Sequence, residues 1–270
     1  MIILTAANAD LAKDDFGNVY PNFSYRGVIQ KTAEKAEQCG YKPIIYDLGT
    51  LGIGKPFYVA NDSFSTKGYY ETEVQKGYKS KSLFKPEMVR HCLEEFNDFT
   101  VYLDGDAQLV DNIDEVLPHK SYDIGVTLRD PYEFESEWYK EHFDIVKYVN
   151  AGVIFFNPTS ATKKFIDIWH KTTEEVGNDQ MALNKLTSPG YYPEIGSTLE
   201  VNGVKIKYFP GTCYNYYYFK RKLCGNIKIM HFKGSVRNFY PFDWKKRLYC
   251  NMVAIIYLKL SPVATRQFFR

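Results

Sequence analysis

Two aspartates directly after a short apolar run are the residues of this chain best suited to chemistry. Residues 101–109 read Val-Tyr-Leu-Asp-Gly-Asp-Ala-Gln-Leu. In a strand, residues i and i+2 point to the same side, so Asp104 and Asp106 can converge on one hard cation. Such a cation keeps open coordination positions for phosphate oxygens. The pattern therefore predicts a metal site that binds a nucleoside diphosphate at the carboxyl end of a buried strand.

Other structures also place two aspartates around a glycine. Asp-Gly-Asp is good turn chemistry, and a turn that binds no ligand remains an alternative. An EF-hand loop needs glycine at its sixth position, which is Leu109 when counted from Asp104. Phosphatases with an aspartyl nucleophile usually have Gly-Thr after the second aspartate, where Ala107-Gln108 stand here. The sequence argues against both of these sites.

A small polar cluster opens another apolar run. Asn150, Ala151 and Gly152 precede the apolar residues 153–156. Small side chains let a ligand approach the backbone closely, while asparagine offers both donor and acceptor atoms. These residues alone favour a simple turn at the start of the strand, and contact with a substrate is the alternative.

The start of a later helix carries a second polar cluster. Asn178 is a favoured N-cap residue, which places Asp179 and Gln180 in the first helical turn. Asp179 can complement the positive end of the helix dipole there. It can also lie at the mouth of a site and, with Gln180, hold sugar hydroxyls. The residues alone leave both roles open.

A histidine and a basic turn end the last expected strand. His231 is followed by Lys233 and Gly234, and glycine permits close approach of a phosphate. In one interpretation His231 is a third metal ligand beside Asp104 and Asp106, while Lys233 and the Gly234 backbone contact the diphosphate. A purely structural histidine is the alternative.

Alternating strands and helices must position these clusters. Strands are expected at 2–7, 43–47, 100–103, 123–127, 149–156, 204–209 and 227–232, and helices at 25–39, 86–96, 161–175 and 179–186. Residues 48–80 are rich in glycine, serine, lysine and tyrosine and are expected to form irregular loops. The β-α-β order at the start predicts an α/β fold with parallel strands and a right-handed crossover.

The composition is that of a globular protein with a substantial core. The chain has 270 residues, 45% of them hydrophobic and 17% aromatic, which excludes a disordered chain. No repeat, low-complexity tract or Pro/Ser-rich linker divides it. The simplest organisation is one α/β domain over residues 1–242 and a helical tail over residues 243–270.

Cysteine usage and the first residues indicate an intracellular protein. The five cysteines lack a paired metal-binding spacing, and an odd number in a long chain favours reduced thiols. The start, Met-Ile-Ile-Leu-Thr, has neither the basic region nor the apolar length of a signal peptide. No segment approaches the roughly 20 apolar residues that span a bilayer. We expect a cytoplasmic location.

Charge is distributed unevenly, although the net charge is only +2. Residues 220–270 hold 12 Lys/Arg and one acid (net +11), and residues 1–219 hold 22 Lys/Arg and 31 acids (net −9). Such a basic segment attracts phosphates, nucleic acid or anionic lipid, and a solvated basic face is the alternative. The basic triplet 245–247 precedes the apolar residues 248–258. This tail fits a peripheral membrane helix or a helix packed on the domain.

In their order along the chain, these segments resemble the GT-A nucleotide-diphospho-sugar glycosyltransferases, most closely those of family 8. The matching segments, from residue 2 to about 240, are Thr5-Ala6-Ala7-Asn8, Lys85 at the start of a helix, Leu103-Asp104-Gly105-Asp106, Asn150-Ala151-Gly152, Asp179-Gln180 with Asn184, Pro210 before Tyr214-Asn215, and His231-Phe232-Lys233-Gly234. No single motif is highly specific, but their order and spacing are. The resemblance implies a GT-A (Rossmann-like) fold, with a mixed, mainly parallel sheet flanked by helices.

The resemblance also implies an activity and a role for each matching residue. The chain would transfer a sugar from a UDP- or GDP-sugar to a glycan, glycolipid or glycoprotein acceptor. Asp104, Asp106 and His231 would bind Mn²⁺ (or Mg²⁺), which acts as a Lewis acid on the departing diphosphate. The residues bordering the base and ribose would be Thr5, Ala6, Ala7 and Asn8. The catalytic residues at the transferred sugar would be Asn150, Asp179 and Gln180. The rest of the donor site would be Lys85, Gly105, Ala151, Gly152, Lys233, Gly234 and Arg237.

Two positions depart from the family pattern. Many family 8 members have Lys-Pro-Trp where Arg237-Asn238-Phe239 stand here, and Arg237 can still pair bidentately with phosphate. An arginine that is common two residues before the position of Lys85 is Leu83 here.

The sequence does not decide whether the reaction would invert or retain the configuration of the sugar. An inverting enzyme needs a carboxylate base, and Asp179 or Asp130 could serve. A retaining enzyme of the family 8 type needs no obvious nucleophile, and none stands out in this chain. The resemblance therefore favours retention of the sugar's configuration.

Two other classes of protein fit parts of the pattern. A sugar-1-phosphate nucleotidyltransferase shares the sheet and the ion, but usually has a Gly-rich basic loop after the first strand. Residues 8–13 contain no glycine. A non-catalytic nucleotide- or nucleic-acid-binding module would spread basic and aromatic residues over a whole face, whereas residues 1–219 are net acidic. We therefore expect a glycosyltransferase with no nucleic-acid partner.

Overall fold

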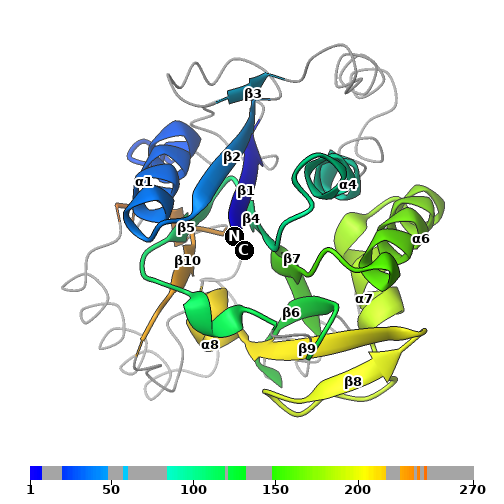
Figure 1. Ribbon diagram of the computed structural model, residues 1–270. Coiled ribbons are helices and arrows are strands. Elements are labelled where there is room, and N and C mark those ends of the chain that lie inside the picture. Colours follow the sequence, from blue (N-terminus) through cyan, green and yellow to red (C-terminus); the bar gives the residue numbers. More distant parts are fainter. Residues whose placement is uncertain are drawn as a thin grey trace, which may run out of the picture.

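A computed structural model describes residues 1–7, 20–47, 57–59, 84–118, 121–131, 148–216, 226–233, 236–237 and 240–241. Within these ranges a central β-sheet is covered by helices on both faces (Figure 1). A second, two-stranded sheet lies on the side of the central sheet that carries the first helix.

The central sheet has eight strands in the order β3-β2-β1-β4-β7-β6-β9-β8. The strands are β1 (Ile2–Ala7), β2 (Lys42–Asp47), β3 (Phe57–Val59), β4 (Thr100–Asp104), β6 (Ile124–Leu128), β7 (Val149–Phe156), β8 (Thr198–Val201) and β9 (Val204–Pro210). Strands β3, β2, β1 and β4 run parallel, as do β6 and β9. Strand β7 is antiparallel to both β4 and β6, and β8 is antiparallel to β9. The predicted α/β fold with a mixed, mainly parallel sheet is confirmed.

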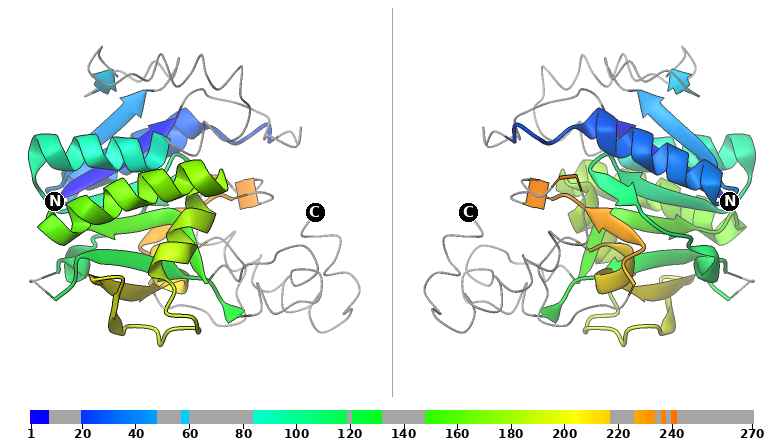
Figure 2. Two further views of the ribbon diagram at one scale, coloured as in Figure 1. Left: turned by 90° about the vertical axis from the view of Figure 1, so that its right-hand side faces the viewer. Right: turned by 90° about the vertical axis from the view of Figure 1, so that its left-hand side faces the viewer.

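The helices divide between the two faces of the sheet. Helix α1 (Tyr25–Gln38) packs on β1 and β2 from one side. The other face carries α4 (Phe84–Phe96), α6 (Ser160–Val176) and α7 (Asp179–Thr187). Figure 2 shows α4 and α6 lying side by side over the sheet. Two shorter helical segments are the 3₁₀ turn η1 (Asp114–Val116) and α8 (Gly211–Tyr214).

Helix α1 shows how local sequence sets an element. The Ser24 hydroxyl accepts a hydrogen bond from the Gly27 N–H at 2.9 Å, which caps the helix start. Val28, Thr32 and Ala36 are buried at helical spacing, so one face of the helix is packed against the rest of the protein. The β1-α1-β2 unit that results is the crossover predicted from the sequence.

Strand β7 is buried along its whole length, which explains why its sequence is continuously apolar after its first residues. Phe156 at its end stacks on Trp169 of α6, with ring centroids 6.2 Å apart and an interplanar angle of 25°. Trp169 is fully buried in the largest hydrophobic cluster of the described residues, which joins α4, α6 and α7 to the sheet. This packing sets the position of the α6–α7 pair over β7.

The second sheet pairs two strands that lie far apart in the sequence. Strand β5 (Ala107–Leu109) runs antiparallel to β10 (Ile229–His231), with His231 opposite Ala107. The Phe232 N–H also donates to the carbonyl oxygen of Asp106 at 2.8 Å. This pairing brings the chain around His231 to the end of β4.

Three of the strands, β3, β5 and β8, were not among those expected from the sequence. Strands β3 and β5 have three residues each, too few for an alternating pattern to be recognised. Strand β3 also lies inside the region expected to be entirely loops, so that expectation is wrong there. The β8–β9 hairpin turns at Asn202 and Gly203, whose φ angles are +53° and +75°. Asn-Gly is the favoured sequence for such a two-residue turn, so this signal was present in the sequence.

Several expectations concern residues that the structure does not describe. The tail 243–270, the domain boundary at 242 and most of the expected loops 48–80 lie outside the described ranges. The described cysteines, Cys39, Cys92 and Cys213, are free thiols. No helix within the described part of the chain combines the length and the apolar composition needed to cross a membrane.

A single buried asparagine ties α7 to the start of β7. Asn184 Oδ1 accepts a hydrogen bond from the Val149 N–H at 2.8 Å. Its Nδ2 donates to the carbonyl oxygens of Val149 at 2.9 Å and Gln180 at 2.8 Å. The amide thus completes the hydrogen bonding of backbone groups that are buried away from water.

Asn184→Ala should lower the free energy of unfolding by about 2–4 kcal/mol, because it leaves buried backbone groups of Val149 without partners. Denaturant-induced unfolding measures this loss. Lys185→Ala, on the exposed side of the same helix, is the matched control and should change stability little. Equal stability of the two variants would contradict the role assigned to Asn184.

Candidate active site

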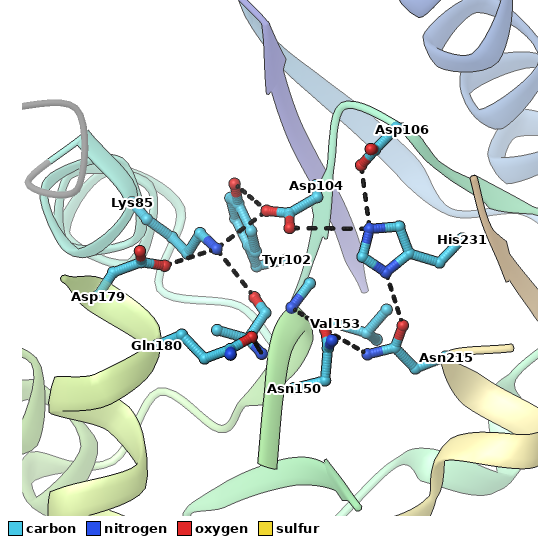
Figure 3. Close-up of polar contacts among 12 residues, drawn as sticks. Lys85, Tyr102, Asp104, Asp106, Asn150, Val153, Asp179, Gln180, Asn215 and His231 are labelled. Carbon is cyan, nitrogen blue, oxygen red and sulfur yellow. Dashed lines mark hydrogen bonds and ion pairs between the residues drawn. The ribbon is translucent and has the colours of Figure 1, made fainter. Parts of the chain in front are cut away.

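The three side chains predicted as metal ligands lie together at one edge of the sheet (Figure 3). Asp104 ends β4, Asp106 precedes β5 and His231 ends β10. Nε2 of His231 lies 3.0 Å from Oδ1 of Asp106 and 4.0 Å from Oδ2 of Asp104. One ligand atom from each residue lies within 4.8 Å of the others.

The spacing and the donor types fit one divalent cation. Two donors that each lie about 2.2 Å from an ion are about 3–4.4 Å apart, which agrees with the two distances from His231. Carboxylate oxygens suit Mg²⁺ and Mn²⁺, and an imidazole nitrogen suits transition metals. A set of two carboxylates and one imidazole can therefore hold an ion such as Mn²⁺.

The Asp-Gly-Asp segment lies tightly against the end of β1. A Cβ atom on Gly105 would stand 2.6 Å from the carbonyl oxygen of Ala6 and 3.2 Å from Cβ of Ala7. Ala6 is also paired with Asp104 in the sheet register. Only glycine fits at position 105 without moving this backbone, so the close packing holds both aspartates at the sheet edge.

Asp104 is held by a lysine and a tyrosine. Nζ of Lys85, from the first turn of α4, lies 3.0 Å from Asp104 Oδ1. The Tyr102 hydroxyl donates to the same oxygen at 3.0 Å. Burial raises the pKa of Tyr102, and the Asp104 carboxylate raises it further, so this hydroxyl remains a donor.

Lys85 joins Asp104 to the other polar clusters. Its Nζ lies 2.7 Å from Oδ2 of Asp179 and donates to the carbonyl oxygen of Ala151 at 3.1 Å. Burial alone would lower the pKa of Lys85, but Asp104 and Asp179 hold it well above its usual value. A permanently charged ammonium group therefore lies between the two carboxylates.

Asp106 is buried and is compensated from two sides. Its Oδ1 lies against His231, and its Oδ2 accepts a hydrogen bond from Arg237 Nη2 at 2.8 Å. Burial alone would raise the pKa of Asp106, but His231 and Arg237 hold it well below its usual value. The carboxylate is thus ionised, as a metal ligand must be.

Arg237 reaches Asp106 across an aromatic surface. Its guanidinium carbon lies 5.5, 5.4 and 5.5 Å from the ring centroids of Tyr20, Phe23 and Tyr25. Its Nη2 also donates to the Tyr25 hydroxyl at 2.9 Å. These contacts fix the guanidinium at the border of the candidate metal site.

The buried side-chain amides of Asn215 and Asn150 form a hydrogen-bonded chain that ends at Nδ1 of His231. Its Nδ1 lies 2.8 Å from Asn215 Oδ1, and Asn215 Nδ2 donates to Asn150 Oδ1 at 3.0 Å. Asn150 Oδ1 also accepts from the Gly152 N–H at 2.8 Å. A Cβ atom on Gly152 would stand 2.3 Å from Cε1 of His231. Gly152 therefore makes room for the imidazole ring.

The start of α7 lies beside Lys85. The Asn178 side chain accepts from the Met181 N–H at 2.9 Å and caps the helix, as predicted. Trp169 Nε1 donates to the carbonyl oxygen of Asp179 at 3.0 Å. Gln180 Oε1 accepts a long hydrogen bond, 3.4 Å, from the Ala151 N–H. Asp179 is in the first helical turn and also forms an ion pair with Lys85.

The structure brings most of the predicted site residues into one region. Those linked by the contacts above are Lys85, Asp104, Asp106, Asn150, Ala151, Gly152, Asp179, Gln180, His231 and Arg237. Ala6 and Ala7 lie against Gly105 at the end of β1, and Thr5 is buried one residue earlier. Lys233 is exposed. Asn8 and Gly234 lie outside the described residues.

Three residues of this region were not predicted as site residues. Tyr102 and Asp104 are two apart on β4, so strand periodicity places both on one side, and this signal was available. Asn215 was noted only as part of a motif, and nothing in its spacing indicates a contact with His231. Tyr25 was expected only as part of a helix, and its contact with Arg237 depends on the fold.

Gly152→Ala should lower the free energy of unfolding by about 1–3 kcal/mol, because the added methyl group meets the buried His231 ring, whose Nδ1 lies 2.8 Å from Asn215 Oδ1. Chemical denaturation measures this cost. In the His231→Ala background the methyl group gains space, so the same substitution should cost less. An equal cost in both backgrounds would show that the ring does not restrict position 152.

Comparison with known protein families identifies the family of the chain. The sequence pattern of the nucleotide-diphospho-sugar transferase family matches residues 54–238, more than half of the chain. No curated protein sequence matches the chain.

Two solved structures share the fold at low sequence identity. One is a glycosyltransferase involved in the glycosylation of the major capsid of PBCV-1, with 12% identity and a TM-score of 0.51 over 88% of this chain and 97% of that chain. The other is the galactosyltransferase LgtC in complex with donor and acceptor sugar analogues, with 15% identity and a TM-score of 0.50 over 94% of this chain and 96% of that chain. The chain therefore belongs to the nucleotide-diphospho-sugar transferase family and has the GT-A glycosyltransferase fold.

Proposed function

We propose that this protein is a metal-dependent, retaining hexosyltransferase that uses a UDP- or GDP-sugar. The observation that carries the proposal is the convergence of Asp104, Asp106 and His231 beside the start of α7, with Lys85 joining the two regions. This arrangement offers a place for a diphosphate-bound cation next to polar groups suited to a sugar. The family match and the GT-A fold support the same reaction class.

Asp104, Asp106 and His231 would hold the ion, which we propose to be Mn²⁺ or, in its place, Mg²⁺. When bound, the ion supplies Lewis-acid stabilisation of the charge on the departing diphosphate. Tyr102 and Lys85 keep the Asp104 carboxylate oriented toward the site by binding its Oδ1, which leaves Oδ2 facing His231.

The phosphate side of the site would be completed by basic groups. Arg237 is held beside Asp106 and is suited to bidentate contacts with phosphate oxygens. We propose that it moves from Asp106 toward the diphosphate when a cation occupies the site, since cation and guanidinium compete for the same carboxylate. Lys233 and the backbone of Gly234 would contact the same phosphates.

The sugar side would be formed by α7 and the start of β7. Asp179 and Gln180 would hold sugar hydroxyls, with Lys85 orienting Asp179. Both acceptor contacts of Asn150 Oδ1 are made within the protein, while its Nδ2 has no hydrogen-bond partner among the described residues. That buried N–H group is therefore available to a sugar oxygen. Thr5, Ala6, Ala7 and Asn8 would border the base and ribose.

Charge compensation at Asp179 favours retention. An inverting enzyme needs a carboxylate that removes the proton of the acceptor hydroxyl. Asp179 Oδ2 is already paired with Lys85 Nζ at 2.7 Å, so an acceptor hydroxyl would have to compete with the ammonium group for this oxygen. A carboxylate in this state is better suited to orienting the sugar.

The proposal also includes an acceptor class, a cellular location and the limits of the catalytic domain. The LgtC structure is a complex with donor and acceptor sugar analogues, and the PBCV-1 enzyme is involved in the glycosylation of a major capsid. We propose by analogy a glycan, glycolipid or glycoprotein acceptor. The catalytic domain would span residues 1–242 and act in the cytoplasm, with the basic tail 243–270 reaching a membrane surface. No nucleic-acid partner is proposed.

Incubation with a panel of nucleotide sugars and Mn²⁺ tests the reaction class. A glycosyltransferase releases a nucleoside diphosphate from one of these donors, slowly to water and faster with an acceptor. A nucleotidyltransferase would instead release pyrophosphate from a nucleoside triphosphate and a sugar 1-phosphate. No donor turnover in the presence of Mn²⁺ and glycan acceptors would contradict the proposal.

Asp106→Asn should remove Mn²⁺-dependent binding of a nucleoside diphosphate, with affinity falling by more than about 100-fold because an anionic ligand is lost. Isothermal titration calorimetry measures this change. His231→Ala should weaken binding less, since water can replace one neutral ligand. Asp111→Asn is the matched control, because that carboxylate pairs with Lys228 at 3.1 Å, outside the group of three ligands, and should leave affinity unchanged. Unchanged affinity in the Asp106 variant would exclude the metal site.

Asp179→Asn should lower the rate of sugar transfer by about 100-fold, since a misoriented sugar loses the reactive geometry. Nucleoside diphosphate affinity should stay near that of the parent protein, because Asp179 is placed at the sugar. Steady-state kinetics and calorimetry on the same samples separate the two effects. Glu175→Gln, on the exposed face of α6, is the control. Normal turnover in Asp179→Asn would leave this residue with a helix-dipole role only.

A further inference from the structure

We infer that Asn215 is a positioning residue that fixes the tautomer of His231, so that the unprotonated Nε2 faces Asp104 and Asp106. The inference rests on the proposed function in so far as it concerns metal binding. Asn215 is fully buried, and its amide lies between His231 and Asn150 (Figure 3).

The orientation of the side-chain amides of Asn150 and Asn215 follows from a backbone N–H group, which can only donate a hydrogen bond. The Gly152 N–H donates at 2.8 Å to one atom of the Asn150 amide, so this atom must be the oxygen. The same oxygen lies 3.0 Å from the Asn215 amide, so the Asn215 atom that faces it must be the NH₂ group. Asn215 Oδ1 then necessarily points to His231.

A second, independent contact gives the same orientation. Thr127 Oγ1 lies 3.2 Å and 3.4 Å from the carbonyl oxygens of Asn150 and Val153, so its proton is directed to a carbonyl. Its lone pairs therefore accept from Asn215, whose Nδ2 lies at 2.8 Å. Both contacts place the NH₂ group of Asn215 away from His231.

The imidazole must match this orientation. Asn215 Oδ1 lies 2.8 Å from His231 Nδ1 and can only accept, so Nδ1 carries the proton. In the neutral ring Nε2 is then unprotonated and carries the lone pair. Nε2 is the atom that lies 3.0 Å from Asp106 and 4.0 Å from Asp104. A metal-binding histidine is commonly oriented through its other nitrogen in this way.

The adjacent carboxylates favour the opposite tautomer. Without Asn215, an Nε2–H group would donate to Asp106 at hydrogen-bond distance, and the lone pair would face away from the candidate metal site. The chain from Gly152 to Asn215 therefore keeps the ring ready for a cation in competition with a nearby acceptor.

Nitrogen-15 NMR of the histidine side chains tests this inference in the full-length, metal-free protein. The pH is raised until the His231 ring is neutral, and the His231→Asn variant assigns its signals. We expect the proton on Nδ1 in the parent protein and on Nε2 in Asn215→Leu. Mn²⁺ affinity measured by calorimetry should fall by about 10–100-fold in Asn215→Leu.

Thr127→Val is the matched control. It removes one buried hydrogen bond from Asn215 but leaves the contact with Asn150 Oδ1, so the tautomer and the Mn²⁺ affinity should match those of the parent protein. Asn215→Ala, which only removes atoms, replaces Asn215→Leu if the latter does not fold. The position of the His231 proton in the parent protein is a test by itself, because that measurement needs no substitution of Asn215.

The outcomes separate the inference from the proposed function. A proton on Nε2 in the parent protein, or on Nδ1 in Asn215→Leu, overturns the role of Asn215 even if Mn²⁺ binds. A proton on Nδ1 in a parent protein that binds no Mn²⁺ supports the role of Asn215 and contradicts the proposed metal dependence.

Discussion

Two carboxylates at the end of a buried strand require compensation of their charge, and the rest of the site follows from this requirement. Moving an ionised carboxylate away from water costs several kcal/mol unless charged or polar groups replace the solvent. Asp104 has Lys85 and Tyr102 for this purpose, and Asp106 has His231 and Arg237. His231 and Arg237 hold the pKa of Asp106 well below its usual value, so this carboxylate is ionised, which is the state that binds a cation.

The fold supplies these groups from segments that are far apart in the sequence. Helix α4 brings Lys85 from one side of the sheet, and the β5–β10 pairing brings His231 from the other. Strand β7 passes between them, and its small residues at 151 and 152 leave space for the Lys85 contact and for the imidazole ring. The site therefore depends on the relative positions of whole elements, and a GT-A sheet provides those positions.

Much of this arrangement could be predicted from local patterns, but its connections could not. The main helices have a helical periodicity and the main strands are short apolar runs, and Asp-Gly-Asp after such a run indicates candidate metal ligands. Strand β5 is too short to be recognised, so the strand pairing that brings His231 to Asp106 was not predicted, although His231 was proposed as a ligand beside the two aspartates. The position of Lys85 between Asp104 and Asp179 depends on where α4 lies over the sheet. Asn215 contacts a ring nitrogen of His231, a residue 16 positions away, which no spacing rule indicates.

The central claim is that one divalent cation binds between Asp104, Asp106 and His231 together with a nucleoside diphosphate. A crystal structure with Mn²⁺ and UDP or GDP, with anomalous diffraction recorded at the manganese absorption edge, tests it most directly. We expect one strong anomalous peak within coordination distance of all three side chains and of the diphosphate, with Arg237 released from Asp106. Nucleotide density with no such peak, or a peak at another group of ligands, would contradict the claim.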